Sequence, residues 1–230
     1  MKHLPSGSAL AIAAFFFQHA VCAAIPFDSA KVSLIENKVY VGNARAGGNS
    51  RHPAETGSTV TAKEFVATDA ASRAELKFAD NSIVRVGQNS IFSFEAGSRT
   101  LSLKEGTMLF YVPHDSGGGN IKTPSFTAAI TGTVGKVATN LIGILRGEVK
   151  VTVDGKVYIV PAGWVLEVID HKVRLFKFKP GFATDGALYL FGGLLPESPD
   201  TGGTPYNYID PLLNRPTHQP QSPHPRYYGY

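Results

Sequence analysis

The histidines of this chain are the first candidates for metal binding or proton transfer, because imidazole does both near neutral pH. Five of them lie beyond residue 23, and none forms an H-x-x-x-H pair that would place two ligands on one face. His218 and His224 are six positions apart in a proline-rich stretch, which would allow weak metal binding at most. We expect ordinary solvated histidines, and therefore neither a metal site nor a cofactor.

The patterns typical of nucleophilic and phosphate-binding sites are also missing. Residues 132–136 read Gly-Thr-Val-Gly-Lys, but they lack the full spacing of a phosphate-binding loop, and we interpret Gly132 as a backbone turn. No G-x-S-x-G elbow occurs, and the one cysteine, Cys22, lies in the first segment. A two-carboxylate hydrolase site would need a cleft, which a sequence alone does not reveal. The sequence therefore predicts no catalytic residues.

The first 23 residues have the pattern of an export signal. Lys2 provides a positive start, residues 9–17 are an unbroken apolar run, and Val21-Cys22-Ala23 resembles a cleavage site. A run of nine is much shorter than the ~20 residues that a membrane-spanning helix needs, so an uncleaved anchor is the lesser alternative. We expect residues 1–23 to be a signal peptide, the mature chain to have no transmembrane helix, and the protein to be periplasmic or secreted.

Charge and composition limit the classes of partner. Charged residues are 17% of the chain, and the net charge of +4 is spread along it without a run of five lysines or arginines. Such a surface does not favour nucleic acid as a partner. Hydrophobic residues make up 43%, which is enough to bury a core.

Apolar residues alternate with polar ones over most of residues 30–178, which predicts an all-β domain of ten or more short strands. Residues 73–78 and 149–153 show this period of two most clearly. Asn, Asp and Gly between such stretches indicate tight turns. The predicted structural turn positions are Asp80, Asn81, Gly106, Gly132, Gly147, Asp154, Gly155 and Gly163.

The end of the chain differs from the β domain in composition. Residues 179–195 form a connecting segment of uncertain structure, in which 187–191 could be a further strand or a helical turn. Residues 196–230 contain eight prolines and five tyrosines, which predicts a disordered Pro/Tyr-rich tail. Trp164 is either a core residue or an exposed stacking platform. The candidate partner contacts are Trp164, Tyr206, Tyr208, Tyr227 and Tyr228.

Five short motifs occur in an order and at spacings that resemble the FecR domain family, over roughly residues 30–168. They lie at residues 57–94, 101–106, 121–133, 145–151 and 160–164. The turn that the family usually writes Asp-Gly-Ser is here Asp80-Asn81-Ser82, and Trp164 stands where the family usually has Gln. The resemblance implies a compact β-solenoid or β-roll of short strands, with a sensing or scaffolding role outside the cytoplasm.

Three functional hypotheses follow. The first is a non-enzymatic exported module that binds a protein or glycan of the cell envelope. The second comes from the resemblance alone, since well-studied FecR members pass a signal from a TonB-dependent receptor to a cytoplasmic sigma factor. We expect a stand-alone module, because the export signal begins at residue 1 and no complete receptor-contacting module follows Val168. The third and weakest hypothesis is a hydrolase.

Overall fold

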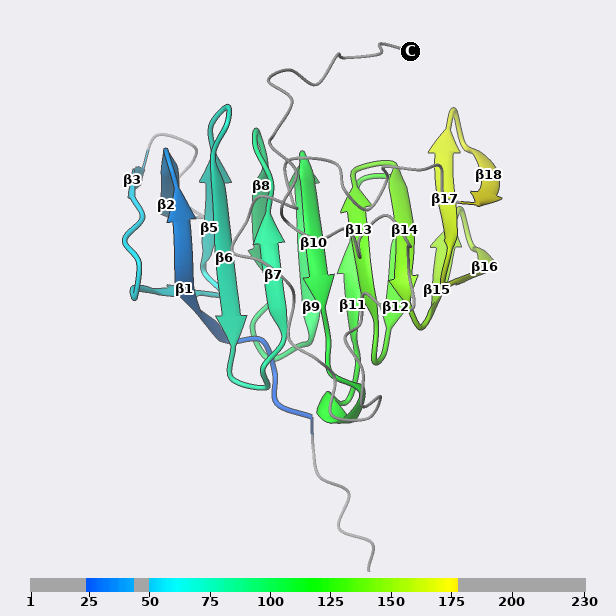
Figure 1. The fold of residues 1–230 in the computed structure, drawn as a ribbon, viewed down its shortest axis with the longest axis horizontal. Helices are drawn as coiled ribbons and strands as arrows, with labels where there is room; N and C mark the ends of the chain where they lie inside the picture. The colour runs from blue at the N-terminus through cyan, green and yellow to red at the C-terminus, as the bar shows by residue number, and fades with distance from the viewer. Residues whose placement is uncertain (1–23, 44–49, 178–230) are drawn as a thin grey trace, which may run out of the picture.

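The structure is a computed structural model that describes residues 24–43 and 50–177 (Figure 1). Strands make up 62% of these residues, and the one helical element among them is a 3-10 turn, η1 (His114–Ser116). The predicted all-β class is therefore confirmed. The predictions for the signal peptide at 1–23, the connecting segment at 179–195 and the tail at 196–230 lie outside the described residues.

Two nine-stranded sheets lie one behind the other in Figure 1. Sheet A contains, in spatial order, β18 (Lys172–Lys177), β17 (Trp164–Ile169), β14 (Leu141–Arg146), β13 (Val134–Ala138), β10 (Thr107–Tyr111), β7 (Ile83–Val86), β6 (Arg73–Phe78), β1 (Ser29–Glu36) and β4 (Thr59–Thr61). Sheet B contains β16 (Lys156–Pro161), β15 (Glu148–Val153), β12 (Thr127–Ile130), β11 (Gly119–Lys122), β9 (Thr100–Glu105), β8 (Ile91–Phe94), β5 (Glu64–Thr68), β2 (Val39–Asn43) and β3 (Arg51–Pro53).

From β6 onward the chain crosses back and forth between the sheets and advances in one direction along both. The hairpin β6–β7 lies in sheet A, β8–β9 in sheet B, β10 in sheet A and β11–β12 in sheet B, and hairpins continue to alternate up to β18. Neighbouring strands pair antiparallel, except β9 and β11, which are parallel. Neither sheet closes on itself. The finer prediction of a solenoid or roll stays a prediction.

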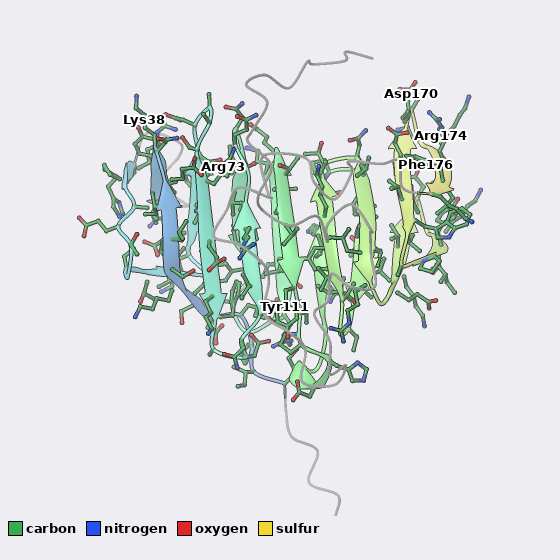
Figure 2. All side chains as sticks on the ribbon, in the orientation of Figure 1. Lys38, Arg73, Tyr111, Asp170, Arg174 and Phe176 are labelled. Carbon is green, nitrogen blue, oxygen red and sulfur yellow. The ribbon has the colours of Figure 1, made fainter. Side chains whose placement is uncertain are left out.

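The hydrophobic core lies between the two sheets, because every second residue of each strand points inward. Phe92 of sheet B and Phe110 of sheet A are both fully buried there. Phe78 contacts two more rings, with centroids 4.5 Å away in Phe27 and 5.2 Å away in Phe94. The edge strand β18, which carries Arg174 and Phe176, closes one end of the sandwich (Figure 2). Within the described residues there is no helix of the length and hydrophobicity that a membrane crossing requires.

The predicted turn positions lie between strands, and most of them have a left-handed backbone. Positive φ angles occur at Asn81 (65°), Gly106 (80°), Gly132 (60°), Gly147 (81°), Asp154 (47°), Gly155 (76°) and Gly163 (83°). Asp80 instead uses its side chain, whose carboxylate accepts hydrogen bonds from the backbone N–H of Ser82 at 2.9 Å and from its hydroxyl at 2.7 Å. Glycine and asparagine suit the left-handed region because their steric cost there is small.

One arginine ties several loops together at one end of the sandwich. The guanidinium of Arg99 lies 2.5 Å from the Asp80 carboxylate, and both side chains are almost completely buried. The same guanidinium donates to the backbone carbonyls of Gly118 and Ile25, and it lies 4.2 Å from the centroid of the Phe27 ring. Arg99 therefore links the first described residues to the β6–β7 turn and to the segment around η1.

Candidate binding groove

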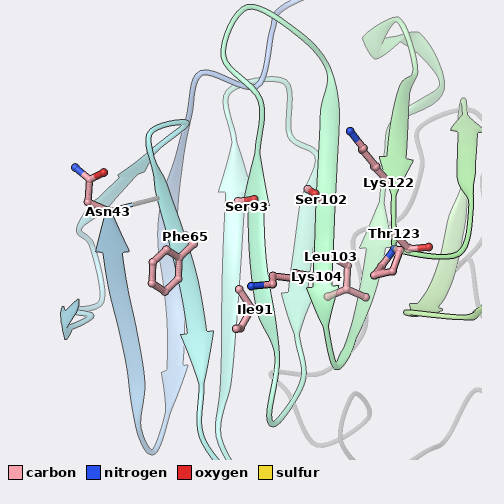
Figure 3. A pocket seen from close by; sticks show the side chains of 10 residues that line it. Asn43, Phe65, Ile91, Ser93, Ser102, Leu103, Lys104, Lys122 and Thr123 are labelled. Atoms are coloured by element: carbon pink, nitrogen blue, oxygen red, sulfur yellow. The ribbon is translucent and has the colours of Figure 1, made fainter. Parts of the chain in front are cut away.

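An open groove of about 560 Å³ lies on the outer face of sheet B (Figure 3). Its lining comes from β2, β5, β8, β9 and β11 and from the turn that follows β11. The lining residues are Asn43, Phe65, Ile91, Ser93, Ser102, Leu103, Lys104, Lys122, Thr123 and Pro124. The groove therefore spans five neighbouring strands, and no single segment of the sequence could form it.

The strand register places five residues in one row across this face. Gly42 is paired with Phe65, Phe65 with Ser93, and Ser93 with Ser102. The parallel pairing of β9 with β11 then sets Ser102 opposite Lys122. Directly opposite residues point to the same side of a sheet. The row therefore runs from an aromatic ring through two hydroxyl groups to a cation.

The apolar end of the groove depends on Gly42. A methyl group on Gly42 would lie 2.4 Å from Cζ and 2.7 Å from Cε1 of Phe65, so the tip of the ring occupies the place of a side chain on β2. Because Gly42 has no side chain, the ring of Phe65 can lie over the neighbouring strand β2. Ile91, which is half-buried, continues the apolar surface on β8.

Two lysines give the other end of the groove a positive charge. Lys104 on β9 and Lys122 on β11 are both exposed, and neither forms an ion pair with a carboxylate of the described residues. Their ammonium groups are free to meet an anionic group of a ligand. The hydroxyl groups of Ser93 and Ser102 between the two ends can donate or accept hydrogen bonds.

A rigid turn forms the wall next to Lys122. The Oγ1 atom of Thr123 accepts hydrogen bonds from the backbone N–H groups of Ser125 at 3.2 Å and Phe126 at 3.1 Å. The backbone N–H of Thr123 donates to the carbonyl of Phe126 at 2.9 Å. Pro124 in this turn has a fixed φ and adds apolar surface. The wall is thus preorganised for contact with a ligand.

The candidate contacts from the sequence do not lie in this groove. Trp164 begins β17 in sheet A, is half-buried against the core, and has the Lys177 ammonium 5.8 Å from its ring. Tyr206, Tyr208, Tyr227 and Tyr228 lie outside the described residues. The turn positions are not among the lining residues either. The groove residues were missed because most of them are ordinary outward residues of their strands, although Phe65 and Ile91 are apolar where polar residues are usual.

The glycine- and lysine-containing stretch at 132–136 is not a ligand-binding loop. Gly132 is a turn residue, and Lys136 belongs to β13 and is almost buried. Among residues 24–43 and 50–177, no three His, Cys, Asp or Glu side chains gather closely enough to hold a metal ion. The side chains that line the groove offer charge, hydroxyl and apolar contacts.

Two crystal structures from Parabacteroides distasonis, both described as a candidate anti-sigma factor, are similar to this chain. They share 15% and 17% identity with it, each with a TM-score of 0.47. The alignments cover 52% and 56% of this chain, and 62% and 65% of theirs, so this chain spans less than two thirds of those proteins. No curated protein matches it in sequence.

The FecR family model, described as FecR protein, matches residues 64–157. Every residue that lines the groove falls within this range except Asn43. The match agrees with the order of motifs in the sequence and supports the resemblance to the FecR family over residues 64–157.

Proposed function

We propose that this chain is a non-enzymatic, exported FecR-like module, which binds a protein partner in the cell envelope through the groove on sheet B. The observation that supports this proposal is the position of the groove, which lies almost entirely within the FecR region. Proteins of this family are associated with signalling, so the bound partner belongs to a signalling or regulatory assembly.

The chemistry of the groove favours a peptide segment of a protein as its ligand. Phe65, Ile91 and Pro124 can hold an apolar side chain, and Lys104 with Lys122 can hold a carboxylate. An extended segment with an aspartate or glutamate near an apolar residue provides both groups within a few residues. A glycan would use the two hydroxyl groups and an aromatic ring, but it would need a carboxylate or sulfate to use the lysines.

A second candidate function is an extracytoplasmic signalling component linked to a TonB-dependent receptor and to sigma-factor regulation. The FecR match supports it, because that is the role of well-studied family members. Deletion of the gene should then abolish a transcriptional response, for example to iron supply. An unchanged transcriptome would contradict this second function and leave the binding function intact.

The binding function is tested by photo-crosslinking in the native host. A photoreactive amino acid replaces Ile91 in the groove or, as the control, Ile159, which is 54% exposed on the outer face of the same sheet. We expect the Ile91 variant to capture a discrete envelope protein that the Ile159 variant does not. Capture of glycan alone, or identical products from both variants, would overturn the proposal.

Charge reversal in the groove provides an independent test. Lys104→Glu with Lys122→Glu should weaken binding of the captured protein about tenfold or more, because two cations at the contact become anions. Lys156→Glu changes an exposed lysine on β16, away from the groove, and should leave binding unchanged. Circular dichroism checks that all variants fold. If the Lys104→Glu/Lys122→Glu protein bound the captured protein as tightly as the Lys156→Glu protein does, the proposed site would be contradicted.

A further inference from the structure

The outer face of sheet A carries an apolar patch that is buried although it points away from the core. Its members have at most 5% of their surface exposed, and they belong to four strands in the middle and at one side of the sheet. The patch residues are Ile83, Leu109, Tyr111, Val134 and Val165. Tyr111 is labelled on β10 in Figure 2. This patch needs a cover that the two-sheet sandwich does not supply.

Strand alternation shows that these side chains point outward. Val84 and Phe110 point into the core, so their neighbours Ile83, Leu109 and Tyr111 point to the other side. The register agrees, since Ile83 pairs with Tyr111 and Tyr111 with Val134. None of the patch residues belongs to the core cluster between the sheets.

The corresponding face of sheet B shows what an uncovered surface looks like in this protein. Val157 and Ile159 point outward from β16, and they are 63% and 54% exposed. Val134 is also an outward valine, but it is only 2% exposed. All described strands belong to sheet A or sheet B, and η1 is the one described helical element, so no third layer of described strands or helices lies over the patch. The cover must therefore come from other residues or from another molecule.

We propose that residues 178–230 of this same chain dock on the outer face of sheet A and cover the patch. β18 ends at Lys177 at the edge of sheet A, so the following residues start beside this face. Five strand spacings, about 25 Å, separate β18 from β7. The 53 residues after Lys177 could span several times this distance when extended.

The composition of residues 178–230 fits an apolar patch. Residues 187–195 read Ala-Leu-Tyr-Leu-Phe-Gly-Gly-Leu-Leu, an apolar stretch that would be costly to leave in water. Residues 180–214 contain four acidic side chains and no lysine or arginine. Arg85 and Lys136 lie in the row of Leu109 on the same face, and Arg85 already forms an ion pair with Glu75 at 2.6 Å. Lys136 adds a positive charge to this face, which suits an acidic segment.

The other stretches outside the described residues fit less well. Residues 1–23 have the pattern of a segment that is removed on export. Residues 44–49 connect β2 to β3, which both belong to sheet B, on the opposite side of the sandwich. A second copy of the chain is another possible cover, but burial of the patch would then depend on protein concentration. A cover from the same chain would not.

Thiol labelling tests the cover with two matched variants. Val134→Cys and Val157→Cys are each made in the full chain with Cys22→Ser, so each protein has one thiol. We expect Val134→Cys to react at least about tenfold more slowly, because its thiol reacts only when the cover opens. A specific protease site inserted after Gly181 then releases the end of the chain, and the rate for Val134→Cys should rise while that for Val157→Cys stays constant. Equal rates in the intact chain would overturn the proposal.

Crosslinking identifies the cover without any cut in the chain. A photoreactive amino acid at position 134 should form crosslinks within one molecule, and mass spectrometry should place them in residues 178–230. The experiment uses an equal mixture of heavy and light isotope-labelled protein, so a contact between two copies would give mixed products. Mixed products, or crosslinks to residues 1–23 or 44–49, would overturn the proposal.

Discussion

The tip of the Phe65 ring lies over Gly42, its register partner on the neighbouring strand, where any side chain would collide with it. This pair contributes both to sheet packing and to the candidate groove. Gly42 has no side chain, so it leaves room for the aromatic ring that lines the apolar end of the groove. Such a pair is an aromatic contact over glycine within an antiparallel ladder, and its effect on stability and on binding can be separated by mutation.

Gly42→Ala is expected to destabilise the protein by about 1–3 kcal/mol, since the new methyl group would lie 2.4 Å from the ring and force it to move. Urea unfolding measures the loss. The double variant Gly42→Ala with Phe65→Ala is the control, because it removes the collision. We expect the alanine at position 42 to cost much less in that background, and an equal cost in both backgrounds would contradict the packing described here.

Removal of one partner of the Arg99–Asp80 pair should be strongly destabilising. Both side chains are almost buried, so Asp80→Asn would leave a buried guanidinium without its counter-charge at a cost of about 3–5 kcal/mol. Thermal and urea unfolding report the change. The control is Glu167→Gln, which breaks a 3.5 Å pair with the largely exposed Arg174 and should cost less than about 1 kcal/mol. Similar losses in the two variants would show that Arg99 does not link the loops as described.

Truncation of an aromatic ring in the core should show how much the packing between the two sheets contributes to the free energy of unfolding. Phe92→Ala removes a fully buried ring between the sheets and should cost about 3–5 kcal/mol. Val157→Ala, at a residue 63% exposed, should change the free energy of unfolding by about 0.5 kcal/mol or less. Both are read from urea unfolding curves, and a small effect of Phe92→Ala would place Phe92 outside the cooperative core.

The class of the fold was predictable because its signal is local. Val149, Val151 and Val153 alternate with polar residues, and all three are buried between the sheets. The division of strands between two sheets was not predictable, because hairpins of either sheet have the same alternation. The turn at Asp170 and His171 was not among the predicted positions: both residues have positive φ, but no glycine follows Asp170, whereas Gly155 follows Asp154.

The candidate groove was less predictable than the fold. Phe65, Ser93 and Lys122 are far apart in the sequence, and only the register of β5, β8, β9 and β11 brings them into one row. The apolar patch on sheet A was hidden for another reason. Ile83 and Val84 are consecutive apolar residues, which identify a strand covered on both faces but do not say what covers the outer one.

Two glycines with the same backbone angle provide a test of the turns. Gly106 has φ of 80° and Gly163 has φ of 83°, so an alanine at either position costs about 1–2 kcal/mol for the left-handed backbone alone. The surroundings differ, because a methyl group at Gly106 would lie 2.0 Å from the Ser90 hydroxyl and 2.6 Å from its Cα, whereas nothing lies within 4 Å at Gly163.

Gly106→Ala should therefore be clearly more destabilising than Gly163→Ala. The Ser90 hydroxyl also accepts a hydrogen bond from the backbone N–H of Thr107 at 2.9 Å, so a shift of Ser90 would disturb the start of β10 as well. The midpoints of urea unfolding for the two variants and the parent give the comparison. Ser90→Gly should not rescue Gly106→Ala, because the Ser90 Cα and the Asn89 carbonyl oxygen, both 2.6 Å from the added methyl group, belong to the backbone and remain. Equal losses for the two alanines would mean that the backbone angle alone, without the contact to Ser90, determines the choice of glycine at position 106.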